Sequence, residues 1–99
     1  MSLARWRSRI DAIDLKLLEL LNERALLALE VGRKKRDAGI ALRDPRREAV
    51  ILARMREQNP GPLTAPAVGR LFRAILAESR RVEARTFAKP RAAKKRARA

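Results

Sequence analysis

The chain has 99 residues, a length that permits one domain with a limited hydrophobic core. It contains no cysteine and no histidine, which excludes disulfides, thiolate nucleophiles, the usual zinc sites and imidazole acid–base chemistry. Its 25 basic and 11 acidic residues give a formal charge of +14, which favours an anionic partner, whether polymer, membrane surface or metabolite. Any catalysis must therefore use Arg, Lys, Glu, Asp or Ser side chains.

The positive charge is concentrated at the C-terminus. Residues 89–99 hold six cations and no acid, so residues 1–88 carry 19 basic and 11 acidic side chains, or +8. We expect residues 1–88 to form one helical domain and residues 89–99 a disordered basic tail. The N-terminus has no apolar signal segment and no window is long enough to cross a bilayer, so we expect a cytoplasmic protein without membrane contact.

The first predicted element is a helix from Leu3 to about Asp37, in which Gly32 is the one breaker. At 1.5 Å per residue this helix is about 50 Å long, which exceeds the diameter of a small domain. Two shorter helices cannot cover its whole apolar face, so we expect the rest to pack on a second copy in an intertwined homodimer. The residues of this face recur at intervals of three and four: Leu3, Trp6, Ile10, Ile13, Leu17, Leu20, Leu27 and Val31.

Two shorter helices are predicted to follow. Asp44, followed by a proline, is typical of a helix N-cap, and this helix ends before Asn59. Thr64, two residues before another proline, starts a third helix that runs to about Arg85. No segment alternates with period two, so the predicted fold class is all-α, with one long, one short and one medium helix per chain.

Charged residues interrupt the apolar face of the first helix. Arg24 stands where an apolar residue is expected, and Lys35 lies only about 20° from the same azimuth and about 16 Å further along the axis. Both side chains can therefore face one cavity. Arg7 lies about 100° away in azimuth and roughly 25 Å from Arg24 along the helix, so a partner subunit would have to bring it to that cavity.

The two shorter helices show the same anomaly. Arg47 and Glu48 occupy the apolar face of the second helix, one turn before Ile51. Ser79 and Glu83 continue the three-and-four spacing of the apolar residues on the third helix. Each of the three helices therefore presents polar side chains where core residues are expected.

Each of these residues taken alone has a simpler explanation. Basic side chains at the edge of an apolar face usually reach water, and the charged pair of the second helix can form weak surface ion pairs. Asp44 can serve only as a cap, and Glu83 can pair with Arg80 or Arg7. Their occurrence together favours a site, because burying several cations is costly unless an anion neutralises them. The sequence therefore predicts a site for a compact polyanion such as a dicarboxylate.

Three segments, in order and with matching spacing, resemble the all-helical chorismate mutase family, the AroQ class. They are "RxxIDxIDxxLLxLLxERxxLALEVGxxK" at residues 7–35, "RDPxRE" at residues 43–48 and "LFxxILxES" at residues 71–79. The resemblance covers about residues 3–85. It implies a homodimeric isomerase with two sites, which converts chorismate to prephenate by a Claisen rearrangement in phenylalanine and tyrosine biosynthesis. It also implies that the reaction uses no cofactor and no metal.

The resemblance also assigns roles by motif position. It implies that Arg24 and Arg47 bind the carboxylates of the chorismate dianion, together with Arg7 of the partner subunit. It implies that Lys35 donates to the ether oxygen whose bond breaks, where negative charge grows in the transition state. Lys35, Arg47 and Glu83 would be the catalytic residues.

The remaining roles also come from the resemblance. Glu48, with the backbone around Asp44, would hold the ring hydroxyl, and Ser79 would lie beside a carboxylate. Glu83 stands where many family members have glutamine as the second donor to the ether oxygen. An ionised Glu83 would repel that oxygen, whereas a protonated one could donate to it. We therefore expect activity to decline as the pH rises through the titration of Glu83.

Other functions are left open. An isochorismate-pyruvate lyase has the same fold and acts by a pericyclic step on a nearly identical dianion. A basic helical nucleic-acid-binding protein would fit the net charge, but such proteins often stack bases on exposed aromatic side chains, and this chain has three aromatic residues. The tail would contact polyanions nonspecifically. Docking onto another aromatic-pathway enzyme is also left open.

Overall fold

In the computed structural model, which describes residues 2–88, the chain forms three helices. They are α1 (Leu3–Asp37), α2 (Pro45–Gln58) and α3 (Ala65–Thr86), and no strand occurs in the described residues. The predicted all-α class and the three predicted helices are confirmed. The predicted basic tail, residues 89–99, lies outside the described residues. Among residues 2–88, no helix combines the length and the apolar character needed to cross a lipid bilayer.

Local signals determine where each helix begins and ends. The side chains of Ser2, Asp44 and Thr64 each accept a hydrogen bond from the backbone N–H three residues later, at 3.0 to 3.2 Å. Gly39, which follows α1, has a φ of 71°, in the left-handed region that glycine adopts without strain. The chain can therefore turn sharply after α1, and Asp44 fixes the start of α2.

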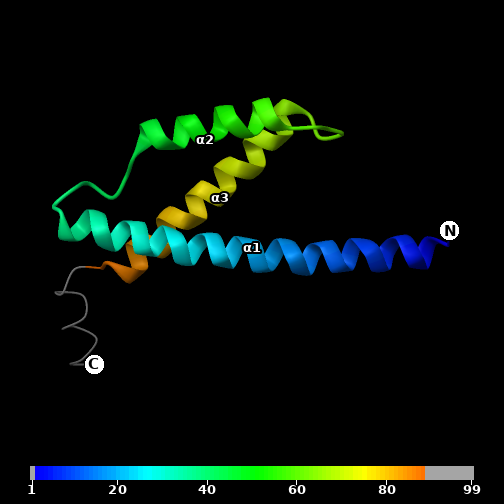
Figure 1. The fold of residues 1–99 in the computed structure, drawn as a ribbon, viewed down its shortest axis with the longest axis horizontal. Helices are drawn as coiled ribbons and strands as arrows, with labels where there is room; N and C mark the ends of the chain where they lie inside the picture. Colours follow the sequence, from blue (N-terminus) through cyan, green and yellow to red (C-terminus); the bar gives the residue numbers. More distant parts are fainter. Residues whose placement is uncertain (1, 89–99) are drawn as a thin grey trace, which may run out of the picture.

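The third helix connects the other two. It packs against both α1 and α2, and in Figure 1 it runs diagonally from the end of α2 to the C-terminal half of α1. The buried apolar side chains of residues 2–88 are Val68 and Leu76, both on α3. The small core of the chain therefore lies along α3.

The N-terminal part of α1 leaves its apolar face uncovered. Figure 1 shows this part projecting past the other two helices, and every residue from 2 to 23 is exposed. A continuous row of this length is typical of an interaction surface. The predicted homodimer stays a prediction, and this is the face that it would bury. Its apolar side chains are 41% to 64% exposed: Leu3, Trp6, Ile10, Ile13, Leu17, Leu18, Leu20 and Leu21.

The C-terminal half of α1 meets the end of α3 at Gly32, the buried residue of α1. The ring of Phe87 lies so close that a Cβ atom at position 32 would be 2.7 Å from its Cε2 atom. Arg36, one turn later, places its guanidinium over the same ring, 4.9 Å from the centroid. Glycine at position 32 thus permits the close approach that anchors α3 on α1.

Gly32→Ala is expected to destabilise the protein, although alanine is preferred to glycine inside a helix by about 1 kcal/mol. The added Cβ would press on the Phe87 ring, and overpacking of this kind costs about 1–3 kcal/mol. Urea unfolding followed by circular dichroism, at fixed protein concentration, would measure the change. Ser8→Ala, on the exposed part of α1, is the control, and a gain in stability for Gly32→Ala would contradict the contact.

Candidate active site

A cleft of about 250 Å³ lies where the three helices converge. A neighbouring hollow of about 290 Å³ shares Arg24, Lys35, Arg47 and Glu83 with it, so the two adjoin. The cleft is lined by residues from α1 (Arg24, Ala28, Lys35), from α2 and the loop before it (Leu42, Arg43, Asp44, Arg47, Glu48, Ile51) and from α3 (Leu76, Ser79, Arg80, Glu83, Ala84).

The cleft brings together all the predicted site residues except Arg7. Arg24 and Lys35 line the same cleft, as their helical spacing predicts. Arg7 is exposed on the N-terminal part of α1 and is not among the described residues that line the cleft of its own chain. The residues that line it are Arg24, Lys35, Asp44, Arg47, Glu48, Ser79 and Glu83.

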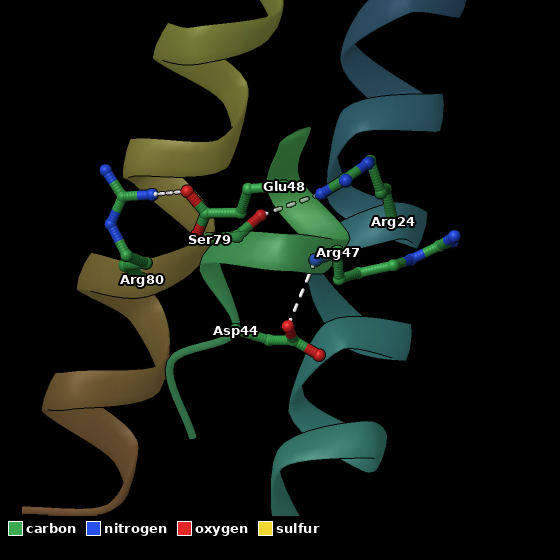
Figure 2. A network of polar contacts seen from close by, with 6 residues as sticks. All are labelled: Arg24, Asp44, Arg47, Glu48, Ser79 and Arg80. Carbon is green, nitrogen blue, oxygen red and sulfur yellow. Dashed lines mark hydrogen bonds and ion pairs between the residues drawn. The ribbon is translucent and has the colours of Figure 1, made fainter. Parts of the chain in front are cut away.

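Arg24 reaches across the cleft from α1 to α3. Its Nη1 atom donates a hydrogen bond to Ser79 Oγ at 2.8 Å in a partly buried position (Figure 2). A guanidinium has five N–H donors, so this bond leaves others for a ligand. Ser79 therefore holds Arg24 in place without neutralising its charge.

Arg47 lies in the first turn of α2. Its backbone N–H donates to Asp44 Oδ1 at 3.0 Å, and this cap fixes the turn that carries the side chain. In Figure 2 the exposed Arg47 side chain extends away from Asp44, on the side of α1. The N-terminus of α2 adds the positive end of a helix dipole to the cleft.

Glu48 forms an ion pair with Arg80. Arg80 Nη1 lies 2.5 Å from Glu48 Oε1, with 38% and 22% of the two side chains exposed (Figure 2). No ion pair between Glu83 and Arg80 occurs in the described residues, so the simpler explanation that these two side chains pair is wrong. Arg80 is a cleft residue that was not predicted, although it lies four residues after Leu76 and three before Glu83 on the same face of α3.

Lys35 and Glu83 lie near each other where α1 meets α3. Lys35 Nζ donates to the Leu42 carbonyl oxygen at 3.3 Å. Burial raises the pKa of the Glu83 carboxyl above its ordinary value; the Lys35 charge opposes this effect and the Glu48 charge adds to it. A carboxyl that keeps its proton to higher pH can donate a hydrogen bond within the cleft.

The cleft has an excess of positive charge. Five cationic and three acidic side chains line it, which leaves two formal positive charges. Glu48 is engaged by Arg80. Within residues 2–88, no carboxylate oxygen lies within 4.0 Å of the charged nitrogens of Arg24, Lys35 or Arg47. This charge balance suits a compact ligand with two negative charges.

The sequence matches known proteins over most of the described residues. A family model described as chorismate mutase type II matches residues 6–84. A bifunctional chorismate mutase/prephenate dehydratase of Neisseria gonorrhoeae is 44% identical over 77 residues, which cover 78% of this chain and 21% of that protein. A chorismate mutase of Methanocaldococcus jannaschii is 46% identical over 55 residues, 56% of each chain. The chain thus spans about a fifth of the length of the bifunctional relatives that it matches.

The fold also matches solved structures. Form II of a chorismate mutase from Thermus thermophilus aligns with a TM-score of 0.82 and 34% identity, covering 84% of this chain and 94% of that chain. Form I of the same protein gives a TM-score of 0.77 and covers 78% of this chain and 96% of that chain. The three-helix arrangement is therefore shared along nearly the whole length of the known structure. On sequence and fold together, the chain belongs to the chorismate mutase type II family.

Proposed function

We propose that this protein is a chorismate mutase that rearranges chorismate to prephenate in phenylalanine and tyrosine biosynthesis. The observation that carries the proposal is the convergence of Arg24, Lys35 and Arg47 in one small cleft, with no carboxylate of the described residues within ion-pair distance. Chorismate carries two carboxylates, which match this excess of positive charge. Membership of the family supports the choice of reaction.

The rearrangement is intramolecular. The ether C–O bond breaks while a C–C bond forms between the enolpyruvyl methylene and the ring, so atoms and electrons balance within the substrate. The protein therefore has to hold the chair-like reactive conformer and stabilise the charge that develops on the ether oxygen. Arginine, lysine and a protonated carboxyl are sufficient for both tasks.

The arginines would select the reactive conformer. Arg24 and Arg47 would each bind a carboxylate, and a planar guanidinium can do so with two parallel hydrogen bonds. The 2.8 Å bond to Ser79 holds Arg24 before substrate arrives, and the Ser79 hydroxyl would then lie beside the bound carboxylate. Fixing both carboxylates lowers the entropy cost of reaching the transition state.

Two donors would act on the ether oxygen. Lys35, positioned by its 3.3 Å bond to the Leu42 carbonyl, would stabilise negative charge that grows as the C–O bond breaks. Protonated Glu83 would be the second donor.

The ring hydroxyl would be held by Glu48. This carboxylate keeps acceptor capacity beyond its bond to Arg80, so it could bind the hydroxyl together with the backbone around Asp44.

The proposal includes a homodimer. Its support is the exposed apolar face of residues 3–21 and the place of Arg7, outside the cleft of its own chain. A partner α1 running antiparallel would cover this face and bring Arg7 of the partner subunit toward Arg24. The site would then gain one more cation for the substrate carboxylates.

Association with another enzyme is a further part of the proposal. The bifunctional relatives are named for chorismate mutase and prephenate dehydratase, which supports docking of this chain onto an enzyme of the same pathway. The cytoplasmic location remains a prediction of the sequence.

The purified protein is expected to consume chorismate and form prephenate, and Lys35→Ala is expected to lower kcat by about 100-fold or more, because it removes a donor to the developing oxyanion. Lys34→Ala, the adjacent exposed lysine, is the matched control and should leave kcat nearly unchanged. Loss of chorismate absorbance with chromatographic identification of the product would measure both. A protein that consumes neither chorismate nor isochorismate would refute the proposal, and release of salicylate and pyruvate from isochorismate would favour the lyase.

Activity is expected to decline as pH rises through the raised pKa of Glu83. Below that pKa the carboxyl is protonated and donates; above it the carboxylate repels the ether oxygen. Glu83→Gln keeps a neutral donor at every pH and should flatten the profile of kcat/KM. Glu78→Gln, an exposed glutamate on the same helix, should retain the wild-type decline. A wild-type profile without an alkaline decline would show that Glu83 is not the donor.

Mixing two inactive variants is expected to restore activity if the site is shared between subunits. In a dimer of Arg7→Ala and Arg24→Ala chains, one site has both arginines and the other has neither. Random exchange would thus recover about a quarter of the wild-type activity. Rates before and after subunit exchange, with sedimentation velocity to confirm the dimer, would measure this. If no activity returns although mixed dimers form, Arg7 and Arg24 do not serve the same site from different chains.

A further inference from the structure

The contact between Phe87 and Gly32 lies directly beside Glu83. A Cβ atom at position 32 would be 2.7 Å from Phe87 Cε2 and 3.6 Å from Glu83 Oε2. The aromatic ring and the carboxyl group therefore meet α1 on the same patch of its surface. Gly32 and Glu83 also line the hollow that adjoins the cleft.

We propose that Phe87 is a positioning residue: its ring, seated on Gly32, fixes the last turn of α3 against α1 and shields one side of the Glu83 carboxyl from water. Glu83 is thereby held beside Lys35 in the protonated form that donates. The contribution of Phe87 to catalysis rests on the proposed function. The effect of Phe87 on the protonation of Glu83 is independent of that function.

The backbone couples Phe87 to Glu83. The Phe87 N–H donates to the Glu83 carbonyl oxygen at 2.9 Å, so the two residues are one helical turn apart and lie on the same face of α3. The edge of the ring lies against Gly32, and the guanidinium of Arg36 lies over the ring, 4.9 Å from its centroid. Displacing the ring would therefore release the end of α3 and the carboxyl with it.

Burial has the largest effect on the pKa of the Glu83 carboxyl and raises it. The nearby charge of Lys35 has the opposite effect and lowers it. The Phe87 ring meets α1 at Gly32, the same residue that the Glu83 carboxyl approaches. Without the ring, water would reach the carboxyl, and the Lys35 charge would then favour its ionised form. Seven other charged side chains share the cleft or the hollow with Glu83. They are Arg24 and Lys35 on α1, Arg43 and Asp44 in the loop before α2, Arg47 and Glu48 on α2, and Arg80 on α3.

The direct test is a titration of Glu83 by carbon-13 NMR of the side-chain carboxyl, assigned with Glu83→Gln. Wild type, Phe87→Ala and Phe87→Leu are compared in the full-length chain, with Thr86→Ala, the adjacent exposed residue, as the matched control. The Glu83 midpoint is expected to fall in Phe87→Ala, to fall less in Phe87→Leu and to stay unchanged in Thr86→Ala. Circular dichroism identifies the folded variants, and Phe87→Leu retains enough of the side chain to decide the question if Phe87→Ala unfolds. An unchanged midpoint in a folded Phe87 variant would overturn the proposal.

The kinetic test separates positioning from a general effect on structure. Phe87→Ala is expected to move the alkaline decline of kcat/KM to lower pH and to reduce activity at neutral pH by about tenfold. In the Glu83→Gln background the same substitution should leave the pH profile flat and reduce activity less, because the amide does not titrate and only its placement is lost. Equal losses in both backgrounds, or an unmoved alkaline decline, would contradict an effect of Phe87 on the protonation of Glu83. If wild type does not consume chorismate, the proposed function fails, whereas the NMR midpoints still decide the role of Phe87.

Discussion

The α1–α3 crossing is held at two points, and the rest of the structure depends on it. At one point Arg24 donates to Ser79 at 2.8 Å, and at the other the Phe87 ring rests on Gly32. Because α2 packs on α3, the position of α2 relative to α1 follows from these contacts. The crossing thus sets how far apart the charged side chains of the three helices lie, and hence the size of the cleft.

The cleft concentrates charge in a way that costs stability. Cations that face one another without carboxylate partners repel, and their partial burial removes hydration. The chain reduces this cost locally, through Ser79 beside Arg24 and Glu48 beside Arg80. The remaining excess would be neutralised only by a bound anion, which would stabilise the folded state by mass action. A preorganised positive cleft of this kind is what electrostatic stabilisation of a transition state requires.

The sequence predicts those features that depend on one helix at a time. Asp44 and Thr64 predict helix starts because a cap is a local interaction, and the azimuths of Arg24 and Lys35 follow from helical geometry alone. Partner choice is different, because it depends on the crossing of two helices. The pairing of Arg80 with Glu48 could therefore not be deduced. For the same reason, the sequence of the first helix alone indicates only that Gly32 weakens that helix. In the fold, Gly32 is the residue against which the Phe87 ring packs.

The length of α1 links assembly to chemistry. Its C-terminal half carries Arg24 and Lys35 into the cleft, while its N-terminal half carries an uncovered apolar face and Arg7. One rigid helix therefore presents two surfaces that its own chain cannot use together, since about 25 Å separates Arg7 from Arg24 along the axis. In the proposed dimer the same burial that stabilises the assembly would deliver the missing cation. Selection for a long apolar helix and selection for a complete site would then act on the same element.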